Sequence, residues 1–168
     1  VLWLLVPQEE IQEALRARAV ERGIDPARLV FAPFVDPARH LARLPQADLF
    51  LDTFPYGAHT TCSDALWMGL PVLTQVGRSF SARVAASLLN AVGLPEMAVG
   101  DEQAYEERAV ALATVPGELA RLRDHLWDER ANLPLFDNER FTGELAALFE
   151  RMVGRWQQGL PPAPLPAA

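Results

Sequence analysis

The chain has 168 residues, of which 50% are hydrophobic and 22% charged, and its formal net charge is -7. This composition is typical of one globular domain and excludes an intrinsically disordered chain. The negative charge argues against nucleic acid and anionic membranes as partners. All 15 basic residues are arginines, which excludes a P-loop lysine or a Schiff-base lysine within these residues.

The cysteine content bears on the cellular compartment of the protein, and the first residues bear on membrane insertion. The single cysteine, Cys62, cannot form an internal disulfide, so we expect a reducing, cytoplasmic environment. The apolar run at residues 1–6 is far too short to cross a bilayer. Because the sequence opens without methionine, directly in a predicted strand, it is expected to be a piece of a larger protein.

Short apolar runs alternate with helical segments in the first half of the chain. We expect strands at 1–6, 29–31, 49–51 and 72–74, and helices at 8–22, about 37–44 and around 65–67. The run at 1–6 is typical of a strand buried on both faces. This alternation predicts an α/β fold, a Rossmann-like parallel sheet with flanking helices.

After Ser79 the pattern becomes helical. Helices are expected at 81–90, 102–113, 117–130 and 139–158, and we predict no further strand. Residues 1–158 are therefore expected to form the folded domain. Residues 159–168 are rich in proline and predict an extended tail.

The turn after the third predicted strand carries the strongest functional signal. Open α/β sheets bind ligands at the carboxyl ends of their strands. Thr60 and Thr61 lead into a helix, whose first amides form a natural site for a phosphate or diphosphate. His59 would donate to a phosphate oxygen, and Asp64 would accept from sugar hydroxyls. The alternative is purely structural, because Thr61 and Asp64 also have the spacing of a capping box.

A second candidate site lies at residues 36–43. Asp36 is typical of a helix N-cap and Pro37 of a first helical residue. His40 and Arg43 are three residues apart and share one helix face, where their planar groups would stack on a nucleobase. An isolated pair of this kind more often belongs to a solvated surface.

The sequence lacks the motifs typical of metal sites, hydrolases and dinucleotide-binding enzymes. One cysteine and three separated histidines give no metal-binding spacing, so no metal is expected. The G-x-S-x-G elbow of hydrolases and the G-x-G-x-x-G dinucleotide fingerprint are both missing.

The run at residues 52–74, DTFPYGAHTTCSDALWMGLPVLT, resembles the O-GlcNAc transferase and SPINDLY family, and the chain is similar to a bacterial-type member. The resemblance extends upstream to Arg28 and downstream through residues 134–137 to about Gln158. It implies the C-terminal, nucleotide-sugar-binding half of a GT-B glycosyltransferase, truncated at its N-terminus and ending in a helical part.

The resemblance also implies roles for individual residues. His59, Thr60 and Thr61 would contact the diphosphate and Asp64 the ribose. The base would lie against Val35, His40 and Arg43. Pro37 stands where animal members carry a lysine that touches the ribose, so this one contact to the sugar donor is not carried over.

By the same resemblance, the intact protein is expected to be an inverting, metal-independent O-glycosyltransferase that needs no cofactor. UDP-N-acetylglucosamine (UDP-GlcNAc) is the expected sugar donor, and a serine or threonine hydroxyl of a protein is the acceptor. The other GT-B half and tetratricopeptide repeats are expected elsewhere in the parent chain, together with the catalytic group. The fragment alone is therefore expected to be inactive.

Three other functions remain open. SPINDLY-type relatives use GDP-fucose, and these residues do not separate the two sugars. A non-catalytic interaction module would keep the fold but use the helix-start residues only as caps. A sugar-nucleotide epimerase of related fold explains the run at residues 52–74 less well.

Overall fold

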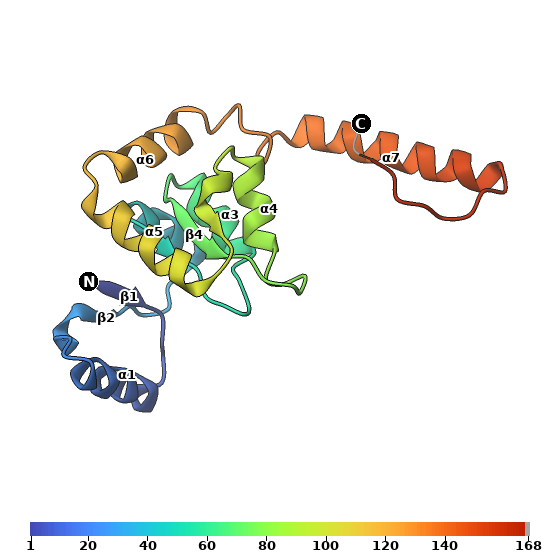
Figure 1. Ribbon diagram of the computed structural model, residues 1–168. Coiled ribbons are helices and arrows are strands. Elements are labelled where there is room, and N and C mark those ends of the chain that lie inside the picture. Colours follow the sequence, from blue (N-terminus) through green and yellow to red (C-terminus); the bar gives the residue numbers. More distant parts are fainter. Residues whose placement is uncertain (167–168) are drawn as a thin grey trace. The chain divides into compact units, whose positions relative to one another are not determined.

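The computed structural model describes residues 1–166 as an α/β protein with parallel sheets and flanking helices (Figure 1). The chain forms two compact units, Val1–Ala42 and the residues from Arg43 onward. The predicted parallel strands are distributed over two sheets, one in each unit. The last two residues of the predicted tail, 167 and 168, lie outside the described residues.

The first unit is built on two parallel strands. Strand β1 (Leu2–Leu4) pairs with β2 (Leu29–Phe31), and helix α1 (Glu9–Glu21) and a 3-10 turn (Pro26–Arg28) connect them. The prediction that β1 is buried on both faces is wrong, since Leu2 is 42% and Trp3 37% exposed. A parallel strand is buried on both faces only where other elements cover both faces of its sheet, and β1 is not covered in this way.

Helix α2 (Pro37–Arg43) follows and reaches the boundary between the units. As predicted, it begins at Pro37, and the Asp36 carboxylate accepts a hydrogen bond from the Arg39 amide at 3.1 Å. A 3-10 turn (Leu44–Gln46) replaces the expected last residue of the helix. Pro45 in this turn has no amide hydrogen for a helical bond.

The second unit contains a three-stranded parallel sheet in the order β3-β4-β5. Its strands are β3 (Phe50–Leu51), β4 (Val72–Gln75) and β5 (Ala98–Val99). Strand β5 contradicts the prediction that no strand follows Ser79. With two residues, it is too short for an apolar pattern to distinguish a strand from a loop.

The second unit also contains helices α3 (Thr60–Trp67), α4 (Val84–Ala91), α5 (Glu102–Thr114), α6 (Glu118–Asp128) and α7 (Asn138–Gln157), with a 3-10 turn (Pro95–Met97) before β5. Helices α3, α4 and α5 pack around β4 (Figure 1). Val72 and Leu73 of β4 are fully buried there, so the core of this unit lies around the central strand.

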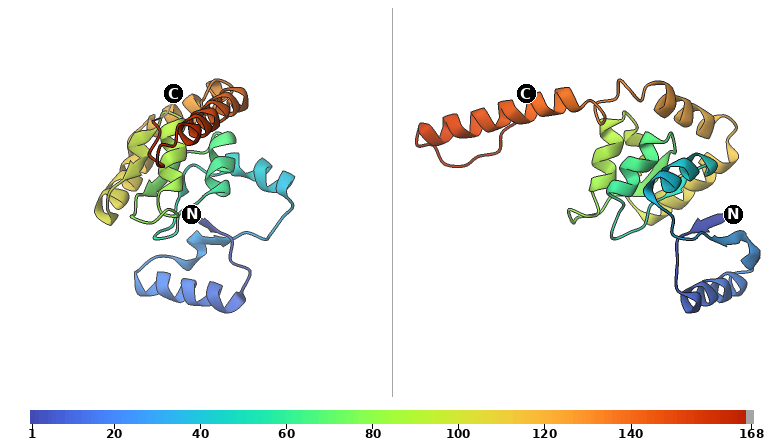
Figure 2. Two further views of the ribbon diagram at one scale, coloured as in Figure 1. Left: turned by 90° about the vertical axis from the view of Figure 1, so that its right-hand side faces the viewer. Right: turned by 180° about the vertical axis from the view of Figure 1, so that it is seen from behind.

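The last two helices of the second unit differ in burial. Leu122 and Leu126 place one face of α6 in the core, whereas α7 has no buried residue. Figure 2 shows the chain turning back beside α7, where Arg155 donates to the Pro161 carbonyl at 2.7 Å and Arg151 to that of Pro166 at 2.8 Å.

Arg130, which follows α6 in the chain, contacts the C-terminal end of α3. The guanidinium of Arg130 lies 4.6 Å from the ring centres of both Trp67 and Trp127. It also donates a hydrogen bond of 3.1 Å to the Trp67 carbonyl. Cation–π contacts of this kind fix the last residue of α3 against α6.

Candidate functional site

The loop between β3 and α3 starts at the carboxyl end of β3. Strand β3 pairs in parallel with β4, with Phe50 opposite Val72 and Leu51 opposite Leu73. The structure therefore places the predicted turn at the sheet edge where α/β proteins bind ligands.

Helix α3 begins without a side-chain cap. Its N-cap residue is His59, and the His59 carbonyl accepts hydrogen bonds from the amides of Cys62 and Ser63, both at 3.1 Å. The capping-box alternative for Thr61 and Asp64 is wrong, because both residues lie inside the helix. The preceding amides of Thr60 and Thr61 lie at the helix start and have no intrahelical acceptors, which makes this end of α3 suited to an anion.

The residues predicted to bind the diphosphate are close together and reachable. Thr60 and Thr61 are exposed, and Asp64, one turn further into α3, is half-buried. All three lie on the helix that His59 precedes. The structure thus brings the predicted diphosphate and ribose contacts together on one short segment.

Aromatic rings hold the His59 imidazole on two sides. Tyr56 stacks on it at 5.3 Å between ring centres with an angle of 18°, and Phe80 meets it edge-on at 6.0 Å. Nε2 of His59 lies 3.4 Å from the Ser81 carbonyl oxygen. Tyr56 and Phe80 are 66% and 76% exposed, so the half-buried imidazole borders an exposed aromatic surface.

Asp52 is a residue of this loop for which the sequence alone predicts no role. Its side chain is buried, with the residue 3% exposed. Oδ1 accepts hydrogen bonds from the amides of Thr53 at 2.8 Å and Ala58 at 2.7 Å, and Oδ2 accepts one from Thr74 Oγ1 at 2.6 Å. The sequence feature that could have indicated a role for Asp52 is its position, directly after a buried strand and before a glycine-containing turn.

Gly57 shows how closely this loop packs. Its amide donates to the Ser81 carbonyl at 3.2 Å. A Cβ atom added at Gly57 would lie 3.0 Å from Asp52 Oδ2 and 3.2 Å from the Ser81 oxygen. The absence of a side chain at Gly57 therefore lets the loop pack closely against Asp52 and Ser81.

The Asp52 carboxylate also affects two neighbouring acids. Burial raises the pKa of the Cys62 thiol to about 12, and the Asp52 charge adds to this effect. Burial and then Asp52 likewise raise the pKa of Tyr105 to about 12, and the Tyr105 hydroxyl donates to the Asp52 carbonyl at 2.8 Å. Cys62 therefore stays a neutral thiol at physiological pH and is no nucleophile.

The predicted base-binding residues belong to different units. Val35 and His40 are half-buried residues of the first unit, and Arg43 opens the second. His40 and Arg43 both lie on α2, as expected from their spacing. Their joint role toward a nucleobase stays a prediction.

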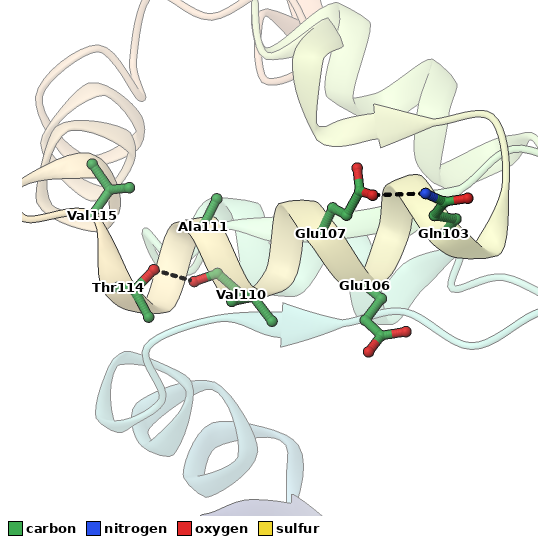
Figure 3. Close-up of a pocket in the computed structure, with 7 residues that line it drawn as sticks. All are labelled: Gln103, Glu106, Glu107, Val110, Ala111, Thr114 and Val115. Atoms are coloured by element: carbon green, nitrogen blue, oxygen red, sulfur yellow. Dashed lines mark hydrogen bonds between the residues drawn. The ribbon is translucent and has the colours of Figure 1, made fainter.

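A pocket lies elsewhere on the second unit. A shallow hollow of about 560 Å³ lies along α5. The residues that line it are drawn in Figure 3: Gln103, Glu106, Glu107, Val110, Ala111, Thr114 and Val115. Gln103 donates to Glu107 at 2.8 Å, so two of its polar groups already bind each other. None of the predicted site residues lines this hollow.

Residues 1–166 contain neither a cluster of metal-ligand side chains nor a helix that could span a membrane. No group of three or more histidine, cysteine, aspartate and glutamate side chains among them is arranged to hold a metal ion. None of the helices in this part of the chain has the length and apolar character needed to cross a membrane.

Comparison with known families gives a match over most of the chain. The family model described as "Glycosyl transferase family 41" matches residues 1–145. The UDP-N-acetylglucosamine–peptide N-acetylglucosaminyltransferase of Caenorhabditis elegans is 37% identical over 161 residues, which are 96% of this chain and 14% of that protein.

Two plant proteins and one solved structure extend the comparison. The probable enzymes SEC of Arabidopsis thaliana and SPINDLY of rice (Oryza sativa) are 35% and 32% identical over 90% and 92% of this chain. A mutant O-GlcNAc transferase of Thermobaculum terrenum superimposes with a TM-score of 0.79 and 34% identity, over 86% of this chain and 28% of that one. The chain spans only 14% to 17% of the three sequence relatives.

Proposed function

Because the chain belongs to glycosyl transferase family 41, we propose that it supplies the binding site for the nucleotide-sugar donor in a protein O-glycosyltransferase. The observation that carries the proposal is the uncapped start of α3 at the carboxyl end of β3, with His59 beside it. The family membership then indicates which anion this site would take, namely the diphosphate of a nucleotide sugar.

Each predicted contact has a physical role in this proposal. The first-turn amides of α3 and the hydroxyls of Thr60 and Thr61 donate to phosphate oxygens. His59 donates from its imidazole, and Asp64 accepts from the ribose hydroxyls. Val35, His40 and Arg43 contact the base.

The same groups would assist the reaction. When the sugar leaves, negative charge grows on the nucleoside diphosphate, and fixed N–H groups stabilise that charge without reorganising. The helix start and His59 would thus stabilise the charge of the leaving diphosphate, which a divalent cation does in other transferases. The catalytic group is expected in parts of the intact protein other than these 168 residues.

The proposed sugar donor is UDP-GlcNAc, and the proposed acceptor is a serine or threonine hydroxyl of a protein. The support is that the Caenorhabditis elegans relative is named as a UDP-N-acetylglucosamine–peptide N-acetylglucosaminyltransferase and the SEC relative as a probable one. A GDP-sugar is the competing donor, and the binding experiment separates the two.

The test is calorimetric titration of the intact protein with UDP-GlcNAc, UDP and GDP. We expect UDP and UDP-GlcNAc to bind, and the His59→Ala variant to weaken both about tenfold or more, as expected for one lost hydrogen bond to a charged group. Preferential binding of GDP would replace the proposed UDP-sugar by a GDP-sugar. Failure of every nucleotide to bind would overturn the proposal.

His125→Ala is the matched control. His125 lies on α6, and its Nε2 is 2.8 Å from the Val92 carbonyl oxygen. Losing this contact is expected to lower stability but leave affinity for UDP within about twofold of the original protein. Equal losses of affinity in both histidine variants would contradict a specific role of His59.

A further inference from the structure

We propose that Asp52 is the positioning residue of the diphosphate site, because its buried carboxylate fixes the backbone at Ala58 and thereby orients His59 and the first turn of α3. The inference rests on the proposed binding of the nucleotide sugar. It adds a residue that makes no contact with the ligand itself.

Helix α3 depends on an anchor outside the helix. Its N-cap residue, His59, provides no side-chain hydrogen bond to the helix. The residue before it, Ala58, donates its amide to Asp52 Oδ1 at 2.7 Å. The hydrogen bond from Ala58 to Asp52 thus holds the chain one residue before the proposed ligand contacts begin.

Asp52 is itself held from the sheet. It follows β3, and its amide donates to the Leu73 carbonyl of β4 at 3.0 Å. Thr74 of β4 then donates to Oδ2 at 2.6 Å. Because Asp52 is tied to two parallel strands, it fixes the position of Ala58 relative to the sheet.

Burial separates the Asp52 charge from the ligand. A buried carboxylate is costly unless hydrogen bonds satisfy it, and bonds to a charged acceptor are about twice as strong as neutral ones. Asp52 is 3% exposed, so a ligand at the helix start does not touch its carboxylate, and the hydrogen bonds from Thr53, Ala58 and Thr74 offset part of its charge. A negative side chain can therefore serve an anion site here without lying against the anion.

One displacement at Ala58 would move several groups. The Gly57 amide donates to the Ser81 carbonyl at 3.2 Å, and Nε2 of His59 lies 3.4 Å from the same oxygen. Ala58 lies between these two residues in the chain. If Ala58 lost its anchor, Gly57 and His59 would both be released from their shared partner.

The experiment compares variants of the intact protein by calorimetry with UDP, each at a temperature well below its own Tm. Asp52→Ala removes the anchor and is expected to weaken UDP binding about tenfold or more. Asp52→Asn keeps one carbonyl oxygen for the two amides, and Thr74 can turn to accept from the new amide. It is expected to rescue part of the affinity, leaving a loss of about threefold to fivefold.

The matched control is Asp137→Asn. Asp137 is also a carboxylate that accepts a backbone amide at the start of a helix, from Arg140 at 2.9 Å on α7. It is expected to leave UDP affinity within about twofold of the original protein. Loss of stability alone lowers Tm without changing the dissociation constant of folded protein, so the two readouts separate support of the fold from positioning.

The outcomes distinguish the two proposals. If His59→Ala weakens UDP binding while both Asp52 variants keep the original affinity, the inference is overturned and the diphosphate site stands. If the original protein binds no nucleotide, the proposed function fails and the inference fails with it. Should Asp52→Ala not fold, the asparagine variant decides, and an affinity within about twofold of the original overturns the inference.

Discussion

The Thr74 hydroxyl donates a hydrogen bond of 2.6 Å to Oδ2 of Asp52, and the two residues are 2% and 3% exposed. This bond joins the carboxyl ends of β3 and β4 through side chains, beyond the backbone ladder. A neutral donor that satisfies a buried carboxylate is worth more than an average hydrogen bond, because its removal leaves part of the charge unsolvated.

Replacing this hydroxyl is expected to destabilise the protein. Thr74→Val keeps the shape of the side chain but removes the bond to Asp52, which should lower the free energy of unfolding by about 2 kcal/mol. Urea denaturation measures the change. The control is Thr114→Val on α5, whose exposed hydroxyl donates to the Val110 carbonyl. A comparable loss in both variants would show that the buried bond has no special weight.

A methyl group at Gly57 is expected to disturb the loop before α3. The added Cβ would lie 3.0 Å from Asp52 Oδ2 and 3.2 Å from the Ser81 oxygen, which forces one of them to move. Gly57→Ala should therefore cost about 1 to 3 kcal/mol and weaken UDP binding as well. Gly100→Ala is the control, because a methyl group there would meet no atom within 4 Å. Equal free energies of unfolding for Gly57→Ala and Gly100→Ala would contradict the close packing at Gly57.

The raised pKa values predict a loss of stability in alkali. The pKa of Cys62 rises from an ordinary 9.0 to about 12 in the folded protein, so the unfolded chain loses this proton first. The stability contributed by the neutral thiol is complete below about pH 9 and is lost as pH rises toward 12. Tyr105 acts in the same direction, since its pKa rises from an ordinary 10.0.

The measurement is urea unfolding at several pH values between about 8 and 11. The free energy of unfolding should fall with pH, and Cys62→Ala should reduce the slope because one of the two groups is gone. Thiol reagents should modify Cys62 no faster than the protein unfolds. Rapid modification of the native protein, or a slope that Cys62→Ala leaves unchanged, would contradict a buried neutral thiol.

Arg123 is expected to stabilise the approach to β3. It donates to the carbonyls of Ala47 at 2.6 Å and Pro45 at 2.9 Å, which ties α6 to the segment before that strand. Arg123→Lys cannot reproduce this two-pronged contact and should cost about 1 to 2 kcal/mol in thermal or urea unfolding. Arg121→Lys, at a more exposed position on α6, should change stability by less than about 0.5 kcal/mol.

Sequence patterns predict the parts of the fold that have a clear period or a distinctive residue. Strand β2 has its predicted bounds, and α5 differs from its predicted bounds by one residue, because apolar spacing and capping residues mark them. The loop and helix carrying His59, Thr60 and Thr61 are recognisable because glycine, histidine and hydroxyls follow a buried strand. Their ligand stays a proposal.

The remaining features depend on contacts between distant segments. The role of Asp52 depends on its hydrogen bonds with Thr74 and Ala58. A local sequence pattern does not predict a hydrogen bond between residues 22 positions apart, such as Asp52 and Thr74. Strand β5 exists because Ala98 pairs with Thr74 of β4, which again is a relation across the sheet. The exposure of β1 depends on whether other elements cover both faces of its sheet, which the apolar run itself does not report.

Helix α3 has one end at the proposed diphosphate site and its other end at Trp67, whose ring lies 4.6 Å from the Arg130 guanidinium. A helix of 8 residues is a stiff rod about 12 Å long, so a small shift at its first turn is carried to its last. Arg130 also faces Trp127, which makes the indole environment sensitive to such a shift. Trp67 is therefore a fluorescent reporter within the protein. Its fluorescence is expected to change when a ligand binds at the opposite end of the helix.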